Sequence, residues 1–239
     1  MLNKTFSLTF ALLLACASSA VQAHQVWIEN TKGQARLYFG EYGDDLRETS
    51  PGRLDEFTGV PAMELRAATQ TRTVAGRLTR EAFVYDVPDS AETLFAEASY
   101  PLIERTASKR PPLLWRLAAR WTANPVRPVA ASAALDLVPT GKVGELRAIF
   151  QGAPLAKAQV TIIAPSGWSR EALTSADGIV RFDLPWRGQY VAEVKHRDKR
   201  PGERDGRQYG EVSYLTTLTF VQASGVRSPA RPGATPGGR

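Results

Sequence analysis

The chain has 239 residues, of which 43% are hydrophobic and 23% charged, with 19 glycines and 16 prolines. This composition excludes collagen-like and wholly disordered chains and leaves room for two domains with cores of their own. The formal net charge is +6, but basic and acidic residues are interleaved along most of the sequence. Because no basic stripe with stacking aromatics emerges, we expect no nucleic-acid partner.

The first 23 residues have the pattern of an export signal. Lys4 precedes an apolar run over 6–15, and small side chains follow up to Ala23. Cleavage after Ala23 would give a periplasmic mature chain that starts at His24 and contains no cysteine. A lipobox ending at Cys16 is the alternative and would make the protein a lipoprotein. No apolar run reaches the roughly 20 residues of a membrane span, so we expect no transmembrane segment in the mature chain.

Residues 24–125 predict an N-terminal β domain. Short β-like stretches separated by Gly, Pro, Asp and Asn predict strands at 25–29, 35–39, 62–67, 71–75, 82–87 and 94–99. The Gly-, Pro- and charge-rich segment 40–61 predicts a long surface loop.

One segment has helical spacing. Leu114, Leu117, Ala118 and Trp121 recur on one face, and prolines flank the segment on both sides. We expect a short linker helix there, packed on a sheet.

Residues 126–222 predict a second β domain, followed by a disordered tail over 223–239. Alternation is clearer here, and strands are expected at 133–138, 145–150, 158–164, 180–184, 189–196 and 212–221. The sequence therefore predicts an all-β fold of two β-sandwich-like domains with one short linker helix.

The second half resembles the transthyretin-like or carboxypeptidase-regulatory-like β-sandwich. Gly152 and Pro154 turn the chain, and Asp177-Gly178 forms a tight turn. The segments that carry the resemblance are 144–160, 174–178 and 182–190. The resemblance implies the fold and is silent on chemistry.

The start of the mature chain, His-Gln-Val-Trp-Ile-Glu over 24–29, resembles the opening of the NikM-like family. These are periplasmic domains of unknown function associated with nickel and cobalt uptake, with a His-x-x-Trp start and a transthyretin-like end that 194–196 and 213–220 resemble. The resemblance covers most of the mature chain and implies an accessory role in metal uptake with membrane uptake components as partners. An acidic insert over 41–48 departs from the family pattern, which leaves nickel, cobalt and copper all open.

The two histidines of the chain, His24 and His196, are the candidate metal ligands. An ordinary His/Cys zinc site cannot be assembled in a mature chain without cysteine. A histidine freed at the N-terminus offers both its α-amino group and its imidazole, and a second histidine would complete a three-nitrogen brace. Such donors favour the later first-row metals, with Cu(II) ahead of Ni(II), whereas the resemblance points to nickel.

Each of these residues also has a plain structural interpretation. His24 can be a frayed terminus and His196 a strand-end residue. The acidic residues Glu41, Asp44 and Asp45 can supply oxygen ligands or form a solvated loop, which is the commoner case.

Three tryptophans raise the same choice between packing and function. Trp27 can shield a metal or pack in the core, and Trp168 and Trp186 can form an exposed ligand platform or pack in the sandwich. For all three we expect packing.

The sequence lacks the Gly-x-Ser-x-Gly, Gly-x-Gly-x-x-Gly and phosphate-loop patterns. We therefore expect a protein that is not an enzyme, with a brace-type copper oxygenase as the enzymatic alternative. The expected function is a periplasmic accessory protein that binds or delivers a transition metal. The alternative is a metal-free interaction module that docks a membrane receptor or a carbohydrate through its β-sandwich.

Overall fold

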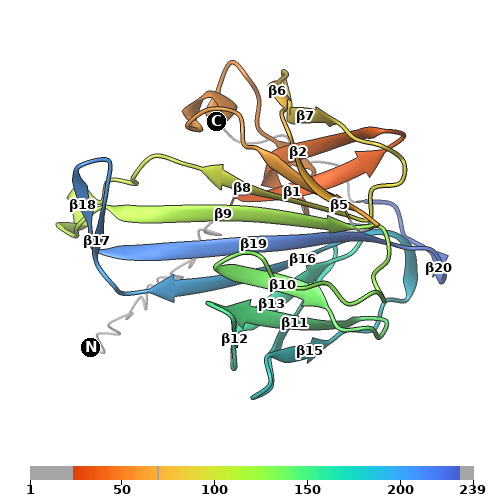
Figure 1. The fold of residues 1–239 in the computed structure, drawn as a ribbon. Coiled ribbons are helices and arrows are strands. Elements are labelled where there is room, and N and C mark those ends of the chain that lie inside the picture. The colour runs from red at the N-terminus through yellow and green to blue at the C-terminus, as the bar shows by residue number, and fades with distance from the viewer. Residues whose placement is uncertain (1–23, 69, 232–239) are drawn as a thin grey trace, which may run out of the picture.

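The computed structural model describes residues 24–68 and 70–231 (Figure 1). The predicted export signal, with Cys16 and the cleavage site, lies outside the described residues, as do the last eight residues of the predicted tail. The described part is nearly all β, as the sequence predicts.

A large sheet of nine strands forms the middle of the molecule. Its order is β14 (Ser169–Leu173), β13 (Gln159–Ile163), β16 (Trp186–Asp198), β19 (Glu211–Gln222), β9 (Leu113–Thr122), β8 (Thr93–Ser99), β4 (Met63–Ala67) and β5 (Gln70–Val74), and β20 (Val226–Arg227) pairs with the start of β16. Neighbouring strands run antiparallel except β9 with β19 and β16 with β20.

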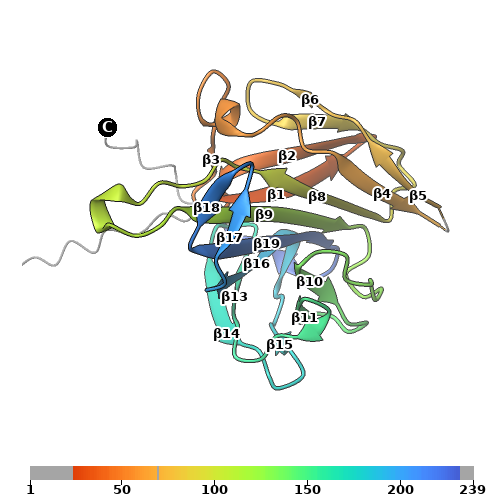
Figure 2. The same cartoon turned by 60° about the vertical axis from the view of Figure 1, so that its left-hand side comes forward.

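A smaller sheet covers each face of the large one. The first contains β1 (Gln25–Thr31), β2 (Gln34–Glu41), β7 (Phe83–Asp86), β6 (Arg77–Leu78) and, beside β2, β3 (Leu46–Arg47). The second contains β10 (Leu135–Pro139), β11 (Glu145–Phe150), β12 (Ala153–Pro154) and β15 (Ile179–Arg181). Figure 2 shows β9 and β19 running between these two sheets. The remaining elements are the hairpin of β17 (Gly202–Arg204) with β18 (Arg207–Tyr209) and the 3-10 turns η1 (Arg53–Glu56) and η2 (Thr106–Ser108).

Strand β19 shows how one strand serves both layers. Successive side chains of a strand point to opposite faces. Thr217 donates its hydroxyl proton to the carbonyl of Val26 in β1 at 2.7 Å, and the neighbouring Thr216 donates to the carbonyl of Leu135 in β10, also at 2.7 Å. Odd-numbered positions of β19 therefore face the first sheet, and even-numbered positions face the second.

The two larger hydrophobic cores lie on opposite faces of the large sheet, and a third, smaller cluster surrounds Trp27. The first packs Val26, Leu37 and Phe39 against Leu94 and Leu117, and the second packs side chains of β10 and β11 against β16 and β19. The two-domain division is not confirmed, because strands from both sides of the predicted boundary at residue 125 pair within one sheet.

The predicted linker helix is wrong: its residues lie in strand β9. Both β19 and β8 pair with β9, and both of its faces are covered, so Leu117, Ala118, Ala119 and Arg120 are all buried. A strand that is buried on both faces lacks the alternation of polar and apolar residues that marks a strand. Its Leu and Ala residues favour helices, and their helical spacing is a coincidence. Pairing with two long strands overrides that propensity.

Two other predicted segments also differ from the structure. Part of the predicted surface loop at 40–61 is buried, since Tyr42, Leu54 and Phe57 all pack in the interior. In the predicted tail, residues 223–231 are described, and β20 pairs there with β16.

Candidate metal centre

His24 lies at the start of β1 with its ring held between two carboxylates. Its Nε2 is 2.5 Å from Oε1 of Glu48, and its Nδ1 is 3.6 Å from Oε1 of Glu41. The ring also packs against Phe39, with 5.0 Å between ring centroids. The side chain is only 11% exposed, so the residue is anchored rather than frayed.

The contact with Glu48 assigns the ring nitrogens. A carboxylate accepts hydrogen bonds, so Nε2 carries a proton, and in the neutral ring the lone pair lies on Nδ1. Arg53 approaches Glu48 from the solvent side, with 4.0 Å between NH1 of Arg53 and Oε1 of Glu48. A carboxylate on the far nitrogen is the arrangement that orients metal-binding histidines and raises their basicity.

Glu41 is the last residue of β2, where it pairs with Leu46 of β3, and it is buried. Its Oε1 has no hydrogen-bond partner among the described residues, although a buried carboxylate oxygen normally has one. Burial, reinforced by the neighbouring carboxyl of Asp44, raises the pKa of Glu41 to about 7. The oxygen is therefore costly to charge in the metal-free protein and is available to a cation.

The separation of the two free atoms suits a shared ion. Metal–nitrogen and metal–oxygen bonds of about 2.0–2.2 Å place two ligand atoms of one ion roughly 3–4 Å apart. The 3.6 Å between Nδ1 of His24 and Oε1 of Glu41 lies within that range. This distance is longer than a hydrogen bond, so the two atoms lie side by side without a hydrogen bond between them.

A second polar network fixes the strand that carries His24. The amide of Gln25 is buried, donates to Oε2 of Glu193 at 2.9 Å and accepts from the backbone N–H of Tyr42 at 3.2 Å. Lys195 pairs with the other oxygen of Glu193 at 2.7 Å. These bonds tie the start of β1 to β16 and to the turn that follows Glu41.

The three acidic residues singled out in the sequence have different positions. Glu41 lies beside His24, and Asp44 lies beside Glu41. Asp45 turns away and pairs with Arg231 at 3.0 Å and Arg47 at 3.6 Å. Glu48 was not predicted as part of the site, although it lies in the same acidic insert.

The structure does not bring His24 and His196 together. Glu193 and Lys195 of β16 face Gln25 and the first sheet, so His196 points to the opposite face. There its ring packs on Phe150 of β11, with 4.3 Å between centroids. A brace built from these two histidines would have to span the thickness of the large sheet.

Side chains alone do not complete a metal site. Within residues 24–68 and 70–231, no three His, Cys, Asp or Glu side chains are grouped so as to hold an ion. His24 and Glu41 supply two donors, and the third available donor is the α-amino group that cleavage after Ala23 would free on His24 itself.

The predicted packing of the tryptophans is confirmed for Trp27 and wrong for Trp168. Trp27 is fully buried between Tyr38 and Tyr42. Trp186 is half-buried against the second core. Trp168 lies in the turn between β13 and β14 and is 64% exposed, with its ring edge-to-face against Trp186.

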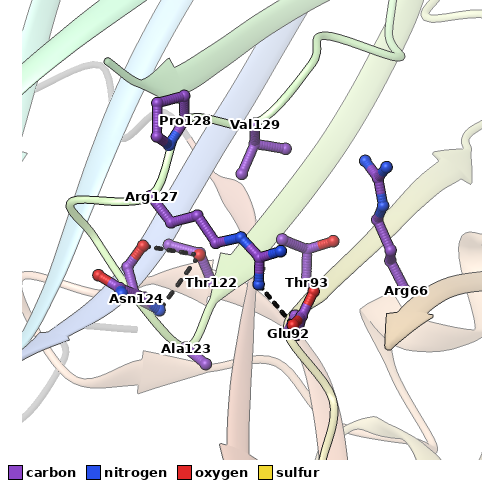
Figure 3. Close-up of a pocket in the computed structure, with 9 residues that line it drawn as sticks. All are labelled: Arg66, Glu92, Thr93, Thr122, Ala123, Asn124, Arg127, Pro128 and Val129. Carbon is purple, nitrogen blue, oxygen red and sulfur yellow. Dashed lines mark hydrogen bonds and ion pairs between the residues drawn. The ribbon is translucent and has the colours of Figure 1, made fainter. Parts of the chain in front are cut away.

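A separate cavity of about 290 Å³ lies where β8 and β9 meet the connection to β10. Figure 3 shows Arg127 reaching across it to pair with Glu92, while Arg66 stands to one side. The polar atoms of Thr122 and Asn124 bond each other there. Since the groups that converge are already paired, the His24 cluster remains the stronger candidate.

Comparison of the chain with protein-family models, with curated proteins and with solved structures gives no match. The resemblance to the NikM-like family and to transthyretin-like sandwiches stays a prediction. In the part of the chain that the structure describes, no helix is long and apolar enough to cross a membrane.

Proposed function

We propose that the protein is an exported accessory protein that binds a divalent transition metal at its mature N-terminus, in support of metal uptake. The α-amino group and Nδ1 of His24 form the chelate, Glu41 supplies the oxygen ligand, and Glu48 orients the imidazole. The observation that carries the proposal is the unpartnered Oε1 of Glu41. It lies 3.6 Å from Nδ1 of His24, and Nε2 of the same ring contacts the carboxylate of Glu48.

The donor set limits the metal. An amine, an imidazole and a carboxylate are hard-to-borderline ligands, and no thiolate or thioether takes part. Such a set suits Cu(II), Ni(II) and Co(II) and disfavours Cu(I). Glu41 and the amine must both lose protons when the ion binds, so binding releases protons and strengthens as the pH rises.

The test is a metal titration of the mature chain, purified without a histidine tag and starting at His24. We expect one Ni(II), Co(II) or Cu(II) ion per chain. His24→Ala should abolish this binding, whereas His196→Ala, the matched control, should leave it within about twofold of the native chain. Stoichiometric binding retained in His24→Ala, or no binding by the native chain, would overturn the proposal.

The second candidate function is a metal-free interaction module, and one observation favours it: the exposure of Trp168. That surface does not compete with the metal site, because it lies on another turn of the molecule.

A further inference from the structure

Three arginines converge on one carboxylate at the end of the large sheet where β16 ends and β9 and β19 begin (Figure 1). The carboxylate belongs to Glu211, the first residue of β19, whose side chain is only 8% exposed. Its Oε1 accepts a hydrogen bond from NH2 of Arg110 at 2.8 Å, contacts NH1 of Arg105 and lies 3.6 Å from NH1 of Arg197. We call these four residues the arginine cluster.

The arginine cluster draws its members from separate parts of the chain. Arg105 and Arg110 lie in the connection between β8 and β9, whereas Arg197 lies near the end of β16. Arg105 is fixed in place, because its side chain is only 14% exposed and its Nε donates to the carbonyl of Pro111 at 2.8 Å. The cluster is therefore assembled by the fold and is not a run of neighbouring surface charges.

Arg110 and Arg197 differ from Arg105 in their exposure to solvent. Their side chains are 52% and 59% exposed, and each directs one nitrogen at Glu211. A guanidinium group has five N–H donors in a rigid fork, so most donors of these two side chains are free. Among the residues that the structure describes, neither arginine pairs with a second acidic side chain. The cluster therefore presents two anchored arginine forks to solvent.

The arginine cluster carries an excess of positive charge. The hydrogen bond from Arg105 lowers the pKa of Glu211, so this carboxylate stays ionised. It compensates one of three guanidinium groups, and the two remaining positive charges repel each other because they are held against the same oxygen atom. Since Glu211 is buried beneath the exposed arginines, an anion that arrives from solvent meets the guanidinium groups first.

The charge and the two forks define the chemistry of a ligand. Chloride or a simple carboxylate would leave one positive charge uncompensated. A phosphate monoester carries a charge of about −1.5 to −2 at pH 7 and has three acceptor oxygens. Different oxygens of one such group can accept hydrogen bonds from both arginines, which is the geometry that favours arginine in phosphate recognition.

We propose that the arginine cluster binds a phosphate group through Arg110 and Arg197, with Glu211 and Arg105 as positioning residues. Free phosphate, a soluble phosphate monoester and a monoester lipid headgroup share this chemistry. The arginine cluster has no residue in common with the His24 cluster, so the proposal does not depend on metal binding.

The first experiment is calorimetric titration of the metal-free mature chain with sodium phosphate at neutral pH and constant ionic strength. We expect one phosphate per chain and much weaker binding of chloride or acetate. Arg110→Gln with Arg197→Gln should lower the phosphate affinity at least about 10-fold. Arg110→Lys with Arg197→Lys keeps the charge but removes the forks, so it should also bind phosphate more weakly than the native chain.

A matched control removes the same charge elsewhere on the surface. Arg77 and Arg116 are exposed to a similar degree, but each has an acidic partner of its own. Arg77→Gln with Arg116→Gln should leave the phosphate affinity within about twofold of the native value. Denaturant unfolding of every variant checks that it is folded. Equal affinity for phosphate and acetate, or equal losses in the cluster and control variants, would overturn the proposal.

A second measurement distinguishes the sources of the phosphate group. The mature chain is sedimented with vesicles of phosphatidylcholine alone and of phosphatidylcholine mixed with phosphatidic acid, whose headgroup is a phosphate monoester. Sedimentation with the mixed vesicles that the cluster variant loses and the control variant keeps would assign the group to a lipid. Calorimetric binding without sedimentation would assign it to a soluble phosphate. Absence of binding in both measurements would overturn the proposal.

Discussion

Oε1 of Glu41 lies 3.6 Å from Nδ1 of His24, and no hydrogen-bond donor of the described chain reaches that oxygen. Buried carboxylate oxygens are costly to leave unpaired. A fold that keeps such an atom next to an imidazole lone pair loses stability without a ligand and regains it when a cation binds between the two.

The first prediction concerns pH and the stability of the metal-free chain. The pKa of Glu41 is raised from 4.5 to about 7, so the folded state favours the protonated form. This contribution is complete below pH 4.5 and is lost as the pH rises through about 7. Glu41→Gln, which stays neutral, should therefore be more stable than the native chain at pH 8, by about 1–2 kcal/mol after allowance for solvent screening.

Denaturant unfolding of both chains across the pH range, with metal removed, measures this difference. The same substitution should weaken metal binding, since an amide oxygen is a poorer ligand. Gain of stability with loss of affinity is the expected signature of a binding group. Parallel stability profiles for the two chains would contradict the role given to Glu41.

The second prediction concerns Glu48, which holds Nε2 of His24. Glu48→Gln can still accept the hydrogen bond from Nε2 of His24 but removes the negative charge beside the imidazole. We expect the metal affinity to fall about 10- to 100-fold while the stoichiometry stays at one ion. Calorimetric titration measures both, and an unchanged affinity would remove Glu48 from the site.

The third prediction tests the turn that carries both glutamates. Gly40 has φ +146°, and a Cβ there would lie 2.2 Å from the carbonyl oxygen of Leu46. Gly40→Ala should displace β3 and lower both stability and metal affinity. Gly59 also has a positive φ, but its Cβ would meet nothing within 4 Å, so Gly59→Ala controls for backbone strain alone. Equal metal affinity in the two variants would show that this turn does not position the ligands.

The fourth prediction concerns a buried ion pair between β9 and β10. Arg120 donates through its Nε to Oδ1 of Asp136 at 3.1 Å and through NH2 to Oδ2 at 2.5 Å, and both side chains are almost fully buried. Asp136→Ala would leave a buried guanidinium without its partner. We expect a loss of about 3–5 kcal/mol in the free energy of unfolding. The exposed pair of Arg116 and Glu97 gives the control, since Glu97→Ala should cost less than about 1 kcal/mol.

Much of the strand pattern could be predicted from the sequence, because strands with one polar face keep their alternation. The segment 145–150 has the predicted ends. Strand β9 could not be recognised, because it is covered on both faces and its Leu and Ala residues carry no period of two.

The candidate site was predictable only in part. The export pattern singled out His24, and local acidity singled out Glu41. Which of Glu41, Asp45 and Glu48 contacts His24 depends on the pairing of β2 with β3 at Gly40 and on the pairing of β1 with β2. These pairings join separate segments of the chain and cannot be read from local sequence. The placement of His196 on the far face of β16 depends likewise on which sheet covers each side.

The most direct measurement of the central claim compares two mature chains that differ at the N-terminus alone. One starts at His24, and the other carries a single extra glycine before it, which leaves every side chain in place and moves the amine off His24. Calorimetric titration with Cu(II) and Ni(II) should give one tightly bound ion for the first chain and a loss of at least about 100-fold in affinity for the second. Equal affinity in the two chains would contradict the claim that the freed amine of His24 completes the site.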